Sequence, residues 1–144
     1  MKQAGCPLCD APGGAVVFQA AKWRVIRAVD AAFPAFYRVV WQDHVAEFTQ
    51  LSREDRITCM DVVATVEGCV REHLSPDKVN LAALGNMVPH LHWHVVARFR
   101  WDSRFPDPVW CPAVRTVSAD QLQTLAGALP ALETDLVGRL ASLG

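Results

Sequence analysis

The fold is decided by the stretch at positions 90–98, which reads His90-Leu91-His92-Trp93-His94-Val95-Val96-Ala97-Arg98. Three of the five histidines of the chain occupy alternate positions in this stretch. Side chains of a β-strand point to opposite faces in turn, so one face would carry the imidazoles and the other Leu91, Trp93 and Val95. In a helix the same rings would fan out by about 100° per residue and could not converge. The stretch therefore predicts a strand with a row of histidines on one face.

A row of imidazoles on one face suits phosphoryl chemistry. Imidazole titrates near neutrality, so it can be a nucleophile, an acid or a metal ligand. One ring can attack phosphorus while a neighbour donates a hydrogen bond to a phosphoryl oxygen, which divides the transfer into two steps. Two other interpretations stay open. The first is a metal site of all three histidines, which is disfavoured because they span about 13 Å along an ideal strand. The second is a histidine-rich edge strand without a functional role.

Outward from this stretch, the sequence predicts further strands and two long helices. The strand pattern itself extends over 91–99. When it is counted from the first histidine of the motif, the candidate catalytic strand covers 90–98. Segments rich in Val, Ile and aromatic residues predict four more strands, over 15–20, 22–29, 36–41 and 78–84. Connections of two to five residues between neighbouring strands allow hairpins but not parallel crossovers.

The two helices are marked by N-cap residues and by apolar side chains at three- and four-residue steps. The first covers 52–74, with Ser52 as N-cap and Asp55 three residues later. The second begins at Ser118, covers 118–142, and has Gln121 in the capping-box position. Pro130 is expected to kink this helix or divide it in two. The residues from 100 to 115 predict a long loop. The fold class is therefore α+β, with an antiparallel sheet of about five strands and two main helices.

Composition limits the classes of protein to which the chain can belong. Its 144 residues favour one domain, over 1–144, with one core. The hydrophobic share of 51% and the charged share of 20% are typical of a globular protein. The net charge of −1 gives no basic surplus for nucleic acid. No run of about 18 apolar residues predicts a membrane span, and Met1–Asp10 lack the apolar core of a signal peptide. We therefore expect a cytoplasmic protein.

Cys6 and Cys9 form a Cys-x-x-Cys knuckle at positions 6–9. The chain has five cysteines, and an odd number argues against a disulfide framework. The knuckle spacing is half of a zinc site, so the other ligands would be histidines, with His44, His73, His90, His92 and His94 as candidates. Free thiols and a redox pair are the alternatives. The Ala-Pro-Gly-Gly sequence that follows the knuckle, in place of a helix, argues against the redox pair.

The sequence from Leu84 to Arg98 resembles the signature of the histidine triad (HIT) family. That signature is His-φ-His-φ-His-φ-φ with φ apolar, and an apolar residue fills every φ position here. The resemblance extends from Cys6 to about Trp110. It implies an α+β fold of about this size, usually a homodimer. It also implies an enzyme that hydrolyses or transfers nucleoside monophosphates from dinucleoside polyphosphates or nucleoside phosphoramidates.

The same resemblance assigns roles by position. It makes His92 the nucleophile on the α-phosphate, His94 a hydrogen-bond donor to the phosphate, and His90 a residue that holds the site by hydrogen bonding or as a metal ligand. Asn86 takes the place of a Gln that contacts the phosphate or the leaving group in many relatives. Asp30 falls near the residue that holds the ribose hydroxyls.

Three further residues near the motif bear on the substrate. Arg98, at the end of the histidine strand, is a candidate phosphate-binding residue because a guanidinium suits phosphate geometry. Two positions depart from the family pattern. Phe36 replaces a fourth histidine of several relatives, and Met87 replaces a Ser or Thr that helps to protonate the leaving group in some. These departures affect substrate choice and rate, but not the nucleophile.

The stretch from Val39 to His44, followed by Leu51-Ser52, resembles the galactose-1-phosphate uridylyltransferase branch of the same superfamily. That resemblance implies a structural zinc held by Cys6, Cys9, His44 and His90, which leaves His92 free. The expected protein is thus a diadenosine polyphosphate hydrolase-like or phosphoramidase-like enzyme that forms a nucleotidyl-histidine intermediate and needs no metal for its chemistry. A non-catalytic nucleotide- or partner-binding module is the alternative, and a metal-dependent hydrolase is the third.

Overall fold

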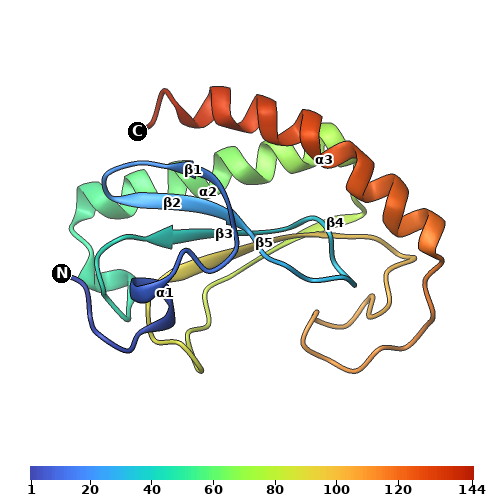
Figure 1. The fold of residues 1–144 in the computed structure, drawn as a ribbon, viewed down its shortest axis with the longest axis horizontal. Helices are drawn as coiled ribbons and strands as arrows, with labels where there is room; N and C mark the ends of the chain where they lie inside the picture. The colour runs from blue at the N-terminus through green and yellow to red at the C-terminus, as the bar shows by residue number, and fades with distance from the viewer.

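The computed structural model describes residues 1–144 and has five strands, two long helices and two short helical turns (Figure 1). The strands are β1 (Ala15–Gln19), β2 (Trp23–Arg27), β3 (Phe36–Trp41), β4 (Lys78–Ala82) and β5 (His92–Arg98). The helices are α1 (Pro7–Asp10), the 3-10 turn η1 (Phe48–Gln50), α2 (Arg53–Leu74) and α3 (Ala119–Leu140). The predicted α+β class with two main helices is confirmed, whereas α1 and η1 were not expected from the sequence.

The five strands form one antiparallel sheet in the order β1-β2-β3-β5-β4. β5 therefore lies between β3 and β4, with both of its edges paired, so the interpretation of the histidine stretch as an edge strand is wrong. The strand begins at His92, two residues later than counted from the motif. His90 lies just before it, in the loop that leads into β5.

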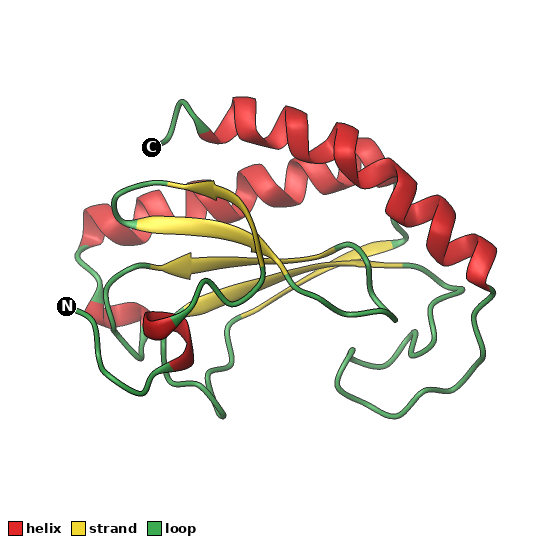
Figure 2. Ribbon diagram, viewed as in Figure 1, coloured by secondary structure: helices red, strands yellow, loops and turns green.

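The two faces of the sheet differ as the alternation in β5 predicts. Val95 and Ala97 point into the main core, which also contains Leu91 and the buried residues of α2 and α3. Both long helices cover this face of the sheet (Figure 2). The opposite face carries His92 and His94, because they alternate with those core residues. Burial of one face thus leaves the histidines on the face that no long helix covers.

The helix signals in the sequence act where expected. The backbone N–H of Asp55 donates to Ser52 Oγ at 3.0 Å, and that of Gln121 donates to Ser118 Oγ at 3.2 Å. α2 ends at Ser75, which has a left-handed backbone with φ of 46°. α3 is not divided at Pro130, because it continues unbroken from Ala119 to Leu140. Figure 1 shows the helix changing direction along its length. A proline inside a helix has this effect because it lacks an N–H and its ring crowds the preceding turn. Neither long helix has an apolar stretch sufficient to cross a lipid bilayer.

Two segments project from the histidine face of the sheet. Figure 1 shows α1 beneath one end of the sheet and the segment after β5, over 99–117, beneath the other. Asp102 holds the start of that segment, since its carboxylate accepts hydrogen bonds from the backbone N–H groups of Phe99, Arg104 and Phe105. The histidines therefore lie between the N-terminal knuckle and a segment with a defined backbone.

Candidate active site

His92 has a fixed tautomer. Its Nδ1 lies 2.6 Å from the carbonyl oxygen of His90, and a carbonyl only accepts, so Nδ1 carries the hydrogen. Nε2 is left with a free lone pair. Burial lowers the pKa of His92 below its usual value, with the charge of Arg38 acting in the same direction. The ring is thus neutral near pH 7, with an unprotonated nitrogen available for attack on phosphorus.

His94 has the opposite tautomer. The Nε–H of Arg38 donates to His94 Nδ1 at 3.3 Å, and because a guanidinium only donates, that nitrogen is the acceptor. Nε2 of His94 therefore carries its hydrogen and can donate to a phosphoryl oxygen. Its ring centroid lies 4.9 Å from that of His92. Burial lowers the pKa of His94 to about 4, and the charges of His92 and Arg38 act in the same direction. The two rings together offer one lone pair and one N–H donor side by side.

The low pKa of His94 makes stability depend on pH. Unfolded, the ring takes up its proton near pH 6.5, whereas folded it does so near pH 4. Above pH 6.5 the ring is neutral in both states. As pH falls from about 6.5 to about 4, only the unfolded chain gains the proton, so the free energy of unfolding falls by on the order of 3 kcal/mol.

We expect denaturant unfolding between about pH 7 and pH 4.5 to show this decline, and a His94→Asn variant to show a shallower one. Comparing the two chains cancels the contributions of titrating groups that do not contact His94. Equal slopes in both would contradict the pKa assigned to His94.

Two aromatic side chains lie against His94. Phe36, at the position where several relatives have a fourth histidine, contacts it edge-on with centroids 5.5 Å apart. Trp110, from the segment after β5, lies 5.2 Å away and is 54% exposed. The neighbouring Val109 is buried with Phe36 and Val96, which anchors the backbone that presents Trp110. His94 thus has an aromatic wall that is open to solvent on one side.

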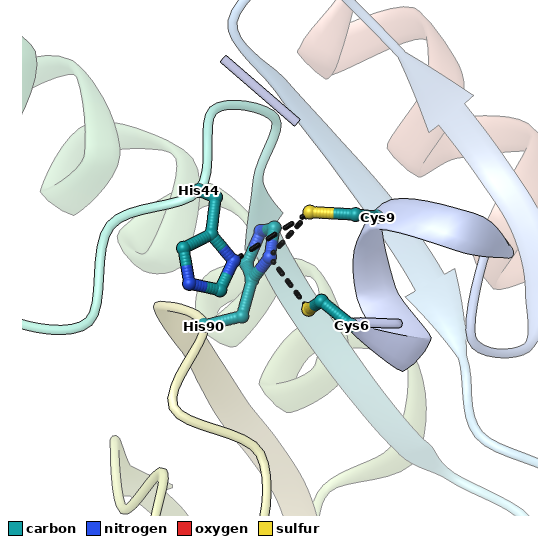
Figure 3. Close-up of side chains that lie close together, drawn as sticks. All are labelled: Cys6, Cys9, His44 and His90. Carbon is teal, nitrogen blue, oxygen red and sulfur yellow. Dashed lines mark hydrogen bonds between the residues drawn. The ribbon is translucent and has the colours of Figure 1, made fainter. Parts of the chain in front are cut away.

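The knuckle cysteines lie against two histidines at one end of the same face. Cys6 Sγ and Cys9 Sγ are each 3.4 Å from His90 Nδ1, and Cys9 Sγ is 3.6 Å from His44 Nδ1 (Figure 3). The four ligand atoms all lie within 4.8 Å of one another. A tetrahedral zinc with ordinary bond lengths would place sulfur and nitrogen about 3.6 Å apart. This set of side chains could therefore hold a metal ion, and its spacing fits zinc.

The surroundings of His90 also suit a metal ligand. His90 is fully buried, and its Nε2 donates to the carbonyl oxygen of Trp41 at 2.6 Å. That bond leaves the Nδ1 lone pair directed at the two sulfur atoms, as metal-bound histidines require. His73, the remaining candidate from the sequence, lies elsewhere, because its Nε2 contacts Asp135 between α2 and α3 at 2.7 Å.

The predicted substrate-binding residues have different environments. Asn86 is exposed, in the loop before His90, and Met87 is 95% exposed beside it. Asp30 lies in the β2–β3 connection, where it lines a pocket together with Pro130 and Glu133 of α3. The structure therefore places Asp30 toward α3 and leaves Asn86 exposed to solvent.

Arg98 faces the protein itself. It is 2% exposed and donates to Asp102, to Asn80 Oδ1 and to the carbonyl oxygen of Asp107. These acceptors engage the guanidinium, which argues against a direct contact of Arg98 with substrate. Its observed role is to hold the segment after β5 against the sheet.

Two residues of this site were missed from the sequence, Arg38 and Trp110. Arg38 had a visible signal, because it is the single charged residue in the otherwise apolar and aromatic strand from Phe36 to Trp41. Trp110 had none, because its position depends on how the long segment after β5 folds back over the sheet.

Comparisons with known proteins identify the family of this chain. Residues 13–101 match the family model described as the HIT domain. A histidine triad protein from Bradyrhizobium japonicum is 28% identical with a TM-score of 0.68, over 83% of this chain and 90% of that chain. Another from Marinobacter aquaeolei VT8 is 26% identical with a TM-score of 0.71, over 94% of this chain and 98% of that chain. No curated protein matches the sequence. The matched residues include all five strands and the three clustered histidines.

Proposed function

This chain belongs to the HIT family, and from that premise we propose that it hydrolyses or transfers nucleoside monophosphates. The proposed substrates are dinucleoside polyphosphates or nucleoside phosphoramidates, attacked at the α-phosphate. The observation that carries the proposal is the pair of complementary tautomers, with a free lone pair on His92 and an N–H on His94. Family membership alone supports nucleotide chemistry in general, and this pair supports a covalent mechanism in particular.

The proposed reaction has two displacement steps. In the first, the lone pair of His92 Nε2 forms a bond to the α-phosphorus. The bond from phosphorus to the leaving group breaks, and its electron pair departs with that group. His94 Nε2–H donates to a non-bridging oxygen as charge develops on it. In the second step, water attacks the phosphorus, loses a proton to solvent and displaces His92, which recovers its lone pair. Nucleoside monophosphate is released, and the enzyme returns to its starting state.

The leaving group restricts which substrates are transferred quickly. Met87 has no proton to donate, and its side chain points into solvent. A leaving group that departs as a stable anion, such as a polyphosphate, needs no such donor. We therefore expect polyphosphate substrates to depend less on this position than phosphoramidates do.

A structural zinc at Cys6, Cys9, His44 and His90 is part of the proposal. The donor set and its spacing support zinc. When bound, the ion would supply a fixed cross-link between the N-terminal segment and the loop that leads into β5. The displacement steps above require only protein side chains and water.

The proposal is tested by giving the purified protein diadenosine polyphosphates and adenosine phosphoramidate, with and without a chelator. We expect release of AMP that continues during a brief exposure to chelator. Nucleotide affinity without any turnover would instead identify a binding module. Immediate loss of activity on chelation, with the fold intact, would identify a metal-dependent hydrolase. The homodimer and the cytoplasmic location stay predictions, and light scattering in solution checks the first.

A further inference from the structure

Arg38 is a charged side chain at the centre of the sheet. It lies on β3, the middle strand, directly opposite His94 of β5 and Ile26 of β2. Its side chain is on the histidine face, since it bonds the His94 ring. Arg38 is half-buried, and its terminal nitrogens are accessible to solvent. The question is therefore what its remaining donors contact.

The hydrogen bonds of Arg38 within the protein leave most of its donors free. Nε donates to His94, whereas neither terminal nitrogen has an acceptor in the chain, and no carboxylate lies within ion-pair distance. The other two arginines on this face, Arg24 and Arg98, differ. Arg24 donates to the carbonyl oxygens of Leu8, Ala11 and Pro12 and to Gln42. Arg38 is thus the arginine of this face with unused donors.

The other contacts of Arg38 do not use those donors. Its guanidinium carbon lies 5.2 Å from the centre of the Phe36 ring, a cation–π contact that uses no hydrogen-bond donor. Asp30 is close enough to act electrostatically, but its Oδ1 accepts from the backbone N–H of Ala32. The planar fork of two terminal nitrogens therefore stays available beside His94, in a geometry that suits a phosphate.

We propose that Arg38 binds the phosphate of the substrate directly, with its terminal N–H groups on the non-bridging oxygens that His94 also contacts. The identity of that phosphate as the α-phosphate of a nucleotide rests on the proposed function. A fixed positive charge at this point stabilises the charge that spreads over the oxygens during transfer. Arg38 would also hold His94 in its donor tautomer, so one side chain would serve both the ligand and its neighbour.

A double-mutant cycle distinguishes direct contact from positioning of His94. AMP and adenosine are titrated by calorimetry, into the millimolar range, against the wild type, Arg38→Met, His94→Ala and the double variant. We expect Arg38→Met to weaken AMP binding about 10- to 100-fold, as loss of a charge-assisted hydrogen-bonded group does, with adenosine affinity unchanged. The decisive result is a loss that persists in the His94→Ala background, smaller than in the wild type because the part exerted through the His94 tautomer is absent there. Arg38→Lys, which keeps the charge without the fork, should retain part of the affinity.

Several outcomes would overturn the proposal. If Arg38→Met has no effect on AMP affinity once His94 is absent, Arg38 acts only through His94. An equal loss of adenosine affinity would show a general disturbance of the site. These binding measurements do not depend on turnover. Arg38-dependent AMP affinity in a protein that turns over no substrate would contradict the proposed function while supporting this assignment.

Discussion

Replacing His92 with alanine is expected to lower turnover by about 10⁴-fold or more, while AMP affinity stays within a few-fold of the wild type. The nucleophile makes its bond only during the reaction, so its removal affects the chemical step and not ground-state binding. Removal of a covalent nucleophile in other enzymes has effects of at least this size. The measurement is single-turnover release of AMP from a dinucleoside polyphosphate, together with calorimetric binding of AMP.

A matched control removes a histidine from the other side of the molecule. His73→Ala deletes an imidazole between α2 and α3, on the helix-covered side of the sheet, and should leave turnover near the wild-type rate. Quenching the wild type in alkali, where the phosphorus–nitrogen bond to histidine survives, should trap AMP covalently attached to the protein, and His92→Ala should trap none. Turnover that persists in the His92 variant would end the assignment of the nucleophile.

Replacing Cys6 with serine is expected to remove the zinc and to destabilise the fold by on the order of 5 kcal/mol. Structural zinc contributes its binding energy to folding, and values in small zinc domains are larger still. Without the ion, the polar groups of Cys9 and His90 stay buried against one another with nothing to coordinate. The knuckle also covers Ile26 and Val40, which would lose part of that cover.

Metal analysis and denaturant unfolding check this expectation. The wild type should contain about one zinc per chain, and Cys6→Ser little or none. Cys111→Ser is the matched control, because Cys111 is a free cysteine outside the cluster of ligands. It should keep both the metal and the stability of the wild type. Unchanged zinc content in Cys6→Ser would show that the four side chains do not hold the ion.

Much of the fold could be predicted because its signals are local. The alternation from His92 to Ala97 depends only on neighbouring residues, and so do the N-caps Ser52 and Ser118. The period of the pattern identified the strand and its two faces correctly. The resemblance to the uridylyltransferase branch predicted His90 beside Cys6 and Cys9, although His90 lies more than 80 positions from both cysteines.

The rest depended on contacts that no local pattern encodes. Arg98 lies an even number of positions from His92 and His94 along β5, so it is on the histidine face of the sheet, as predicted. The segment after β5 folds back over it, and Asp102 binds the guanidinium, which a period-two pattern cannot reveal. Arg38 was visible as a charge on an apolar strand, but its partner is 56 positions away. Pro130 shows the reverse case, in which packing of α3 on the core outweighs the local preference to break the helix.

The link between His90 and His92 has a consequence for how such a protein can change over evolutionary time. The ring of His90 faces the cysteines, but the atom that sets the tautomer of His92 is the main-chain carbonyl of the same residue. Every amino acid carries that carbonyl. A lineage can therefore lose the metal ligand at position 90, and with it the two cysteines, without losing the acceptor on which the nucleophile depends. Metal binding and catalysis share one residue, yet mutation can separate them.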